Sequence, residues 1–163
     1  MTADILHVAV AGGGSWGTAL AHVLASAGHD VTLVLRDPAV ESAVNERHEN
    51  PRYLPGKALH PGVKASLSPD AIRRCNLLVL AVPCQHQRAW LASMRPVIAE
   101  RCVIVNASKG LENGTCLTMS RVVMEELSAL SPRYAVLSGP SFAAEVMDAQ
   151  PTAVVLGCEN DAL

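Results

Sequence analysis

The sequence is poor in aromatic residues and has no long apolar run and no strong charge of either sign. Its 163 residues include one Phe, two Trp and two Tyr, and 17% of them are charged. No apolar stretch approaches the roughly 20 residues of a membrane-spanning helix, so we expect no membrane insertion. The formal net charge of −2 argues against a broad basic surface, so we expect no nucleic-acid partner.

Cysteine and histidine lack the spacing of metal or redox sites. The five cysteines include no C-x-x-C pair, and the six histidines are scattered without ligand spacing, so we predict no metal site. No secretory leader is recognisable at the start of the sequence. We therefore expect reduced thiols and a cytoplasmic location.

The strongest local signal that is present is a glycine-rich turn. The apolar run 7–11 leads into Gly12, Gly14 and Gly17 of a G-x-G-x-x-G motif, and a helical pattern and a second strand follow. This context favours dinucleotide binding over a plain strand-to-helix turn with spare glycines. Gly12 permits the tight turn, Gly14 lets the backbone approach a pyrophosphate, and Gly17 lets helix and strand pack closely. The helix N-terminus then faces the anion.

The rest of the chain alternates between apolar runs and segments of helical periodicity. We expect strands over 7–11, 31–35, 63–67, 77–82, 103–105, 134–137 and 152–156, and helices over 18–27, 39–47, 69–74, 85–94, 115–127 and 143–147. Such alternation predicts an α/β fold with a doubly wound, mainly parallel sheet of Rossmann type. Half of the residues are apolar, so 1–163 can form one NAD(P)-binding domain with its own core.

Four of the expected strand ends carry unusual loops. Each contains small residues, Pro or Gly that let the backbone approach a ligand: 12–17, 82–84, 107–110 and 138–142. Ligands of such sheets bind beyond the carboxyl ends of the strands. We expect the four loops to converge on one edge.

Arg36 follows the second strand, where the choice between NAD and NADP is made. A guanidinium can bind a 2′-phosphate through two hydrogen bonds, which favours NADP with NAD tolerated. Two ordinary explanations stay open: Arg36 is a solvated charge paired with Asp37, and Asp37 caps the next helix ahead of Pro38.

Six blocks of the chain resemble, in order, the motifs of bacterial NAD(P)-dependent glycerol-3-phosphate dehydrogenase. They are GGGSWGTALA (12–21), RDP (36–38), NPRYLPG (50–56), AVP (81–83), ASKGLE (107–112) and GPSFAAEV (139–146). The resemblance implies hydride transfer between dihydroxyacetone phosphate and sn-glycerol 3-phosphate, which supplies a glycerophospholipid precursor. Cys84 departs from the family pattern, in which a small hydroxyl residue is familiar; a thiol is nearly isosteric, so we expect little effect.

The resemblance also assigns site residues. It places the cofactor on Ser15, Trp16, Arg36, Tyr53, Lys109 and Ala143, and the substrate on Lys109, Gly139 and Ser141. A Lys among small residues at a strand end suits a phosphate or a polarised carbonyl oxygen.

Each assignment has a structural alternative. Lys109 could be an exposed loop lysine, Ser141 a helix N-cap, and Trp16 a residue that packs on the next helix. Tyr53 could lie on a flap over the cofactor or be the packed aromatic that anchors its loop. Phe142 could belong to the core or to a lid.

In the family, a helical second domain follows and supplies the general-acid lysine. We expect that domain to be absent from this chain, so no catalytic residue can be assigned here, and the 163 residues alone should bind NADP(H) weakly without turnover. A homodimer is one assembly open to the full-length enzyme. Two alternatives remain: a non-catalytic NAD(P)-sensing module, and the first domain of another hydroxy-acid or 3-hydroxyacyl dehydrogenase.

Overall fold

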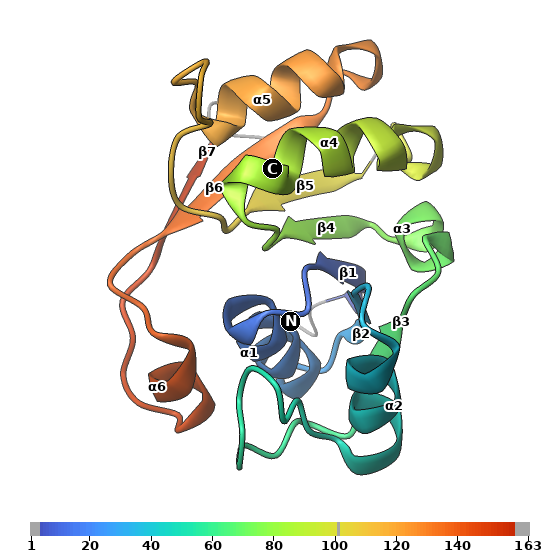
Figure 1. Ribbon diagram of the computed structural model, residues 1–163, viewed down its shortest axis with the longest axis vertical. Coiled ribbons are helices and arrows are strands. Elements are labelled where there is room, and N and C mark those ends of the chain that lie inside the picture. The colour runs from blue at the N-terminus through green and yellow to red at the C-terminus, as the bar shows by residue number, and fades with distance from the viewer. Residues whose placement is uncertain (1–3, 101, 159–163) are drawn as a thin grey trace.

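The computed structural model describes residues 4–100 and 102–158 (Figure 1). The strands are β1 (His7–Ala11), β2 (Asp30–Val34), β3 (Val63–Ser66), β4 (Leu77–Leu80), β5 (Val103–Asn106), β6 (Arg133–Ser138) and β7 (Val155–Cys158). The helices are α1 (Ser15–Ser26), α2 (Pro38–Arg47), α3 (Asp70–Arg74), α4 (Cys84–Met94), α5 (Met119–Glu126) and α6 (Ala143–Met147), with short 3-10 turns at Arg95–Val97 and Ser128–Leu130.

The strands form one sheet in the order β3-β2-β1-β4-β5-β6-β7. Every pairing is parallel except that of β6 with β7. The order reverses between β1 and β4, which is the switch point where doubly wound sheets bind their ligands. The predicted Rossmann-type sheet is therefore confirmed.

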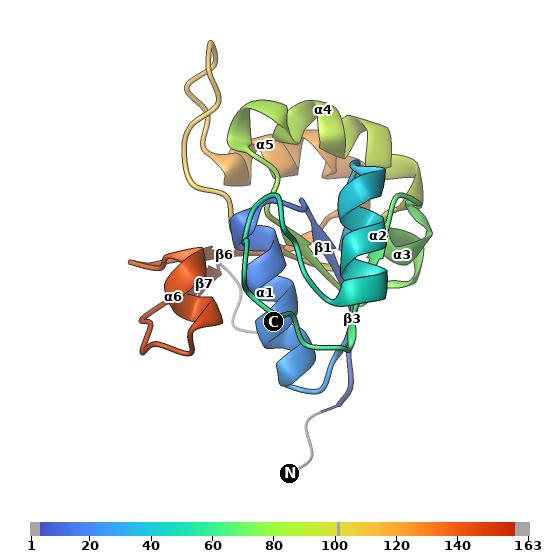
Figure 2. The same ribbon diagram turned by 60° about the horizontal axis from the view of Figure 1, so that its bottom comes forward.

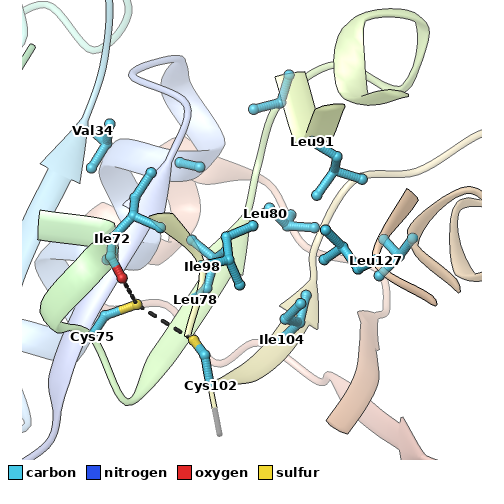
Figure 3. Packing of buried hydrophobic residues seen from close by; sticks show 14 of the residues in the cluster. Val34, Ile72, Cys75, Leu78, Leu80, Leu91, Ile98, Cys102, Ile104 and Leu127 are labelled. Atoms are coloured by element: carbon cyan, nitrogen blue, oxygen red, sulfur yellow. Dashed lines mark hydrogen bonds between the residues drawn. The ribbon is translucent and has the colours of Figure 1, made fainter. Parts of the chain in front are cut away.

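Helices cover both faces of the sheet, and each face has its own apolar core. Successive residues of a strand point to opposite faces, so Val8 and Val10 of β1 pack with α1 and α2, whereas Ala9 and Ala11 pack with α3, α4 and α5. Figure 3 shows the second core, where Leu80, Leu91 and other apolar side chains meet between the sheet and the helices. Cys75 and Cys102 lie in that core with their Sγ atoms 3.5 Å apart.

Three of the expected boundaries move by three residues or more. The helix predicted over 18–27 begins at Ser15, directly after its N-cap Gly14. The helix predicted to begin at residue 115 begins at Met119, because Cys116 (φ +56°) has a left-handed backbone that a helix excludes. The last strand, predicted over 152–156, lies at Val155–Cys158 and runs antiparallel to β6. Among the described residues, no helix has the length and apolarity that crossing a membrane requires.

Candidate functional site

Close packing requires two glycines of the motif, Gly12 in the turn after β1 and Gly17 in the first turn of α1. Gly12 has φ +116°, and a Cβ atom there would lie 2.6 Å from the carbonyl oxygen of Ala81. A Cβ atom on Gly17 would lie 1.9 Å from the carbonyl oxygen of Gly12. Both distances are too short for real atoms, so side chains at these positions would push α1 away from β1 and β4.

Gly14 differs, because no atom lies within 4 Å of where its Cβ would be. It is the N-cap of α1 and provides no side-chain cap, so the backbone N–H groups of Ser15 and Trp16 in the first turn have no helical partner. An open space at a helix N-terminus that is closely lined by backbone suits a pyrophosphate.

Gly13 is a required glycine that the motif does not specify. A Cβ atom on Gly13 would lie 2.8 Å from Cβ of Leu35, at the end of the neighbouring strand β2. The G-x-G-x-x-G pattern leaves this position free, so no sequence signal marks it. Its constraint comes from the approach of the turn to β2.

Arg36 is exposed and forms no ion pair with any described residue. The alternative in which it pairs with Asp37 is wrong, because Asp37 pairs with Arg52 instead. Asp37 also caps α2 by accepting a hydrogen bond from Ala39 N at 3.0 Å, as the capping explanation predicted. The hydrogen bond from Arg52 is the main cause that lowers the pKa of Asp37. Arg36 is therefore left available for a ligand.

The loop that carries Tyr53 is fixed by Asn50 rather than by an aromatic side chain. Asn50 is fully buried, and its Nδ2 donates to Gly13 O at 3.0 Å and to Thr18 Oγ1 at 2.8 Å. Tyr53 is 44% exposed, with Arg52 over its ring, so it is not the packed anchor. Asn50 thus ties this loop to the glycine turn, and the segment lies alongside α1 (Figure 2).

Trp16 is half-buried and packs against the core beneath α1 and α2. Its indole Nε1 is buried and donates no hydrogen bond within the described part of the chain. The packing supports the structural explanation of this residue, and the cofactor contact stays a prediction.

The four predicted loops converge on one edge of the sheet, as expected. The turn at Gly12 touches Ala81, and a Cβ atom on Gly110 would lie 2.9 Å from Sγ of Cys84. Lys109 Nζ donates to Gly139 O at 2.7 Å, which joins the loops after β5 and β6. The loops after β1, β4, β5 and β6 are therefore neighbours in that order.

The residues predicted for the substrate lie together at the β5 and β6 ends. Lys109 is exposed, and Ser141 Oγ donates to the same Gly139 oxygen at 3.4 Å. Gly139 has φ +150°, and a Cβ atom on it would lie 2.5 Å from the oxygen of Ala153. The structure therefore brings an ammonium and a hydroxyl to one backbone carbonyl.

Neighbouring residues settle two alternatives. Ser141 is not a helix cap, because the N-cap of α6 is Phe142 and no side chain caps that helix. Phe142 is 68% exposed, so it does not belong to the core. Ala143 is the first residue of α6, which packs against α1 (Figure 2).

A cavity of about 320 Å³ lies next to Lys109. Its walls include side chains that the sequence did not mark, among them Asn106, Thr118, Ser120 and Tyr134. Burial raises the pKa of Tyr134 to about 12, so its hydroxyl stays protonated at neutral pH. These residues are spread over three elements without a shared motif, so only the tertiary structure groups them.

Comparisons with known proteins agree with this geometry. Residues 7–163 match the family model described as NAD-dependent glycerol-3-phosphate dehydrogenase N-terminus. The chain is 53% identical over 161 residues to glycerol-3-phosphate dehydrogenase [NAD(P)+] of Desulfovibrio desulfuricans, covering 99% of this chain and 48% of the relative. It is 54% identical to the enzyme of the same name from Nitratidesulfovibrio vulgaris, covering 95% and 47% of the two chains.

Solved structures give the same result. The crystal structure of glycerol-3-phosphate dehydrogenase from Coxiella burnetii superposes with a TM-score of 0.84 at 33% identity, covering 94% of this chain and 46% of that one. The yeast enzyme from Saccharomyces cerevisiae has a TM-score of 0.86 at 23% identity, which shows the fold alone; it covers 98% and 49% of the two chains. The chain therefore spans about half the length of the relatives that it matches.

Proposed function

This chain belongs to the NAD-dependent glycerol-3-phosphate dehydrogenase N-terminal family, and from that premise we propose that residues 1–163 form the NAD(P)-binding domain of such an enzyme. The observation that carries the proposal is the open space at Gly14, next to Gly12, Gly13 and Gly17, where close packing leaves no room for a Cβ atom. That shape suits the pyrophosphate of a dinucleotide at the α1 N-terminus. Ser15 and Trp16 supply the first N–H groups.

The proposed reaction interconverts dihydroxyacetone phosphate and sn-glycerol 3-phosphate. When bound, the nicotinamide would supply or accept the hydride. Lys109, Gly139 and Ser141 would hold the triose phosphate, since the ammonium can bind its phosphate or carbonyl oxygen and the hydroxyl can bind a triose hydroxyl. The carbonyl of Gly139 keeps Lys109 Nζ near Ser141.

The remaining cofactor contacts follow from the positions of the side chains. Tyr53 stands on the loop that Asn50 fixes to the glycine turn, and Ala143 opens α6 beside α1. We propose that both border the bound dinucleotide, with Lys109 at its nicotinamide end. The cytoplasmic location, predicted from the cysteine pattern and the start of the sequence, and a homodimer of the full-length enzyme both remain predictions.

Arg36 makes NADP the preferred cofactor in this proposal. Its guanidinium is exposed, and Asp37, which could have neutralised it, is occupied by Arg52. A 2′-phosphate can therefore pair with Arg36 without breaking an existing ion pair.

The test is a titration of the purified chain with NADPH and with NADH, followed by tryptophan fluorescence. Arg36→Ala should weaken NADPH binding by about tenfold or more and leave NADH binding unchanged, because one charge-assisted contact is worth roughly 1.5–3 kcal/mol. Arg47→Ala is the matched control, since Arg47 is a similarly exposed arginine that is paired with Glu49. Equal loss for both cofactors would contradict the role of Arg36, and no binding by the unaltered chain would contradict the proposed domain.

A non-catalytic NAD(P)-sensing module is the second candidate, because the same glycine turn would serve it. The alternative hypothesis, another hydroxy-acid dehydrogenase, is not supported, since both the family model and the relatives named above are glycerol-3-phosphate dehydrogenases. Assay of the complete protein that contains these residues separates the two: a sensor would bind NADPH without oxidising it when dihydroxyacetone phosphate is added.

A further inference from the structure

The segment that carries Lys109 has little secondary structure of its own. Residues 107–118 connect β5 to α5. Among the described residues of this segment, the only β-type pairing is the isolated bridge between Leu111 and Thr118. Gly110 has φ +134°, and Cys116 also lies in the left-handed region. The segment's own backbone hydrogen bonds, from Glu112 N to Leu117 O and from Cys116 N to Glu112 O, both lie C-terminal to Lys109. Contacts from outside the segment therefore decide where Lys109 lies.

Gln85, in the first turn of α4, both donates a hydrogen bond to the backbone of this segment and accepts one from it, as a neighbouring β-strand would. Its Nε2 donates to Leu111 O at 2.8 Å, and its Oε1 accepts from Asn113 N at 2.8 Å. One side-chain amide thus satisfies a carbonyl and an N–H group two residues apart.

Arg88, one turn further along α4, binds Glu112, the residue between Leu111 and Asn113. Its Nε and Nη2 donate to the two carboxylate oxygens of Glu112 at 2.7 and 2.9 Å. The same guanidinium reaches Glu126 at 2.8 Å and Glu125 at 2.9 Å, both on α5. Side chains of Glu112 and Glu126 are only 12% and 18% exposed, so solvent screens these pairs less than it screens ordinary surface pairs.

The electrostatics agree with this geometry. The hydrogen bonds from Arg88, and then that from Thr115, lower the pKa of Glu112 to about 2. The carboxylate is therefore charged around neutral pH, where it forms the bidentate pair with Arg88.

Contacts from the β4–α4 region continue on the N-terminal side of the loop. Ser108 Oγ donates to Val82 O at 2.6 Å, and Gly110 packs against Cys84 so closely that a Cβ atom would not fit. Each residue from 108 to 113 except Lys109 therefore contacts the β4–α4 connection or α4 itself. Lys109 alone points to the β6 end, where it reaches Gly139.

We propose that Gln85 and Arg88 are positioning residues for Lys109: by fixing Leu111, Glu112 and Asn113 to α4, they set where its ammonium meets the substrate. This inference rests on the proposed function, in which Lys109 binds the triose phosphate. Neither residue needs to touch substrate or cofactor. A misplacement of about 1 Å at a reacting group can cost about 100-fold in rate, so the effect is measurable.

The experiment compares Gln85→Ala, Arg88→Met and Lys109→Ala in the complete protein that contains these residues. Gln85→Ala and Arg88→Met should each lower kcat/KM for dihydroxyacetone phosphate by about 10- to 100-fold. The Kd for NADPH should rise by less than about threefold, because Lys109 is only one of the proposed cofactor contacts and the others lie outside this segment. Arg88→Lys keeps the charge but loses the two-pronged contact, so it should recover only part of the activity. Arg47→Met removes an exposed ion pair of α2 and should leave kcat/KM unchanged.

The double variant Arg88→Met/Lys109→Ala distinguishes positioning from general loss of stability. If Arg88 acts through Lys109, the double variant should lose no more kcat/KM than Lys109→Ala alone. The inference would be overturned if the double variant lost the product of the two single-variant factors in kcat/KM, or if kcat/KM were unchanged in both Gln85→Ala and Arg88→Met. If Arg88→Met does not fold, Glu112→Gln gives the same comparison with a milder change. An unimpaired Lys109→Ala would instead overturn the proposed substrate role of Lys109.

Discussion

Among single residues, Gly14 and Gly17 separate cofactor binding from folding. Gly14→Ala should fold with nearly unchanged thermal stability, because its φ of −75° suits alanine and its Cβ would meet no atom. It should lose NADPH binding, since the new methyl group occupies the space proposed for the pyrophosphate. Gly17→Ala should fail to fold or lose several kcal/mol, because its Cβ would overlap Gly12 O. Thermal melts of both variants with and without NADPH measure their stability and their cofactor binding. A Gly14→Ala variant that still binds NADPH would contradict the proposed pyrophosphate site.

His22 should make stability depend on pH. Its Nδ1 accepts a hydrogen bond from His60 N at 3.0 Å, and burial, followed by the nearby His60, lowers its pKa from 6.5. Between that value and the lower folded pKa, the unfolded chain binds more protons than the folded one, so stability falls as the pH drops through this window. Urea denaturation at several pH values between 5 and 8 gives the free energy of unfolding as a function of pH. This free energy should change less with pH in His22→Gln than in the unaltered protein. An identical slope in the variant would assign the dependence to other groups.

Among the elements, the loop of residues 50–56 depends on Asn50. Asn50→Ala leaves Gly13 O and Thr18 Oγ1 without their buried donor, which should cost about 2 kcal/mol in the free energy of unfolding. Tyr53→Ala should cost less than about 0.5 kcal/mol, because the side chain is 44% exposed. Denaturant titrations compare the two. A larger loss of stability for Tyr53→Ala than for Asn50→Ala would instead support Tyr53 as the residue that anchors the loop.

At the scale of the whole molecule, the 163 residues should bind NADPH without reducing dihydroxyacetone phosphate. Of the three lysines, Lys57 pairs with Asp148 and Lys64 with Asp30, which leaves Lys109 as the lysine at the carboxyl edge of the sheet. One ammonium and the Ser141 hydroxyl hold a substrate from one side only, and hydride transfer needs both reactants held in near-attack geometry. NADPH absorbance at 340 nm is the measurement; turnover above the blank by the purified chain would contradict this expectation.

The sequence by itself determined the architecture, and it indicated the sheet edge at which the proposed site lies. Alternating apolar runs and helical periods fix a parallel sheet because such a sheet buries whole strands, and the glycine motif fixes where backbone must approach a ligand. Arg36 and Lys109 could be selected because each follows a strand at the edge where ligands bind. The sequence does not locate the start of α5, because helical periodicity extends over Cys116, whose left-handed backbone excludes a helix there.

Only the tertiary structure decided which partners these residues have. Asp37 could pair with Arg36 or Arg52, and the choice depends on where the loop of residues 50–56 folds back. The contacts of Gln85 and Arg88 with residues 111–113 join residues 24 to 28 positions apart, and the hydrogen bond from Asn50 to Gly13 spans 37. Such contacts leave no periodic pattern in the chain, because side chains meet through packing of separate elements rather than through sequence spacing.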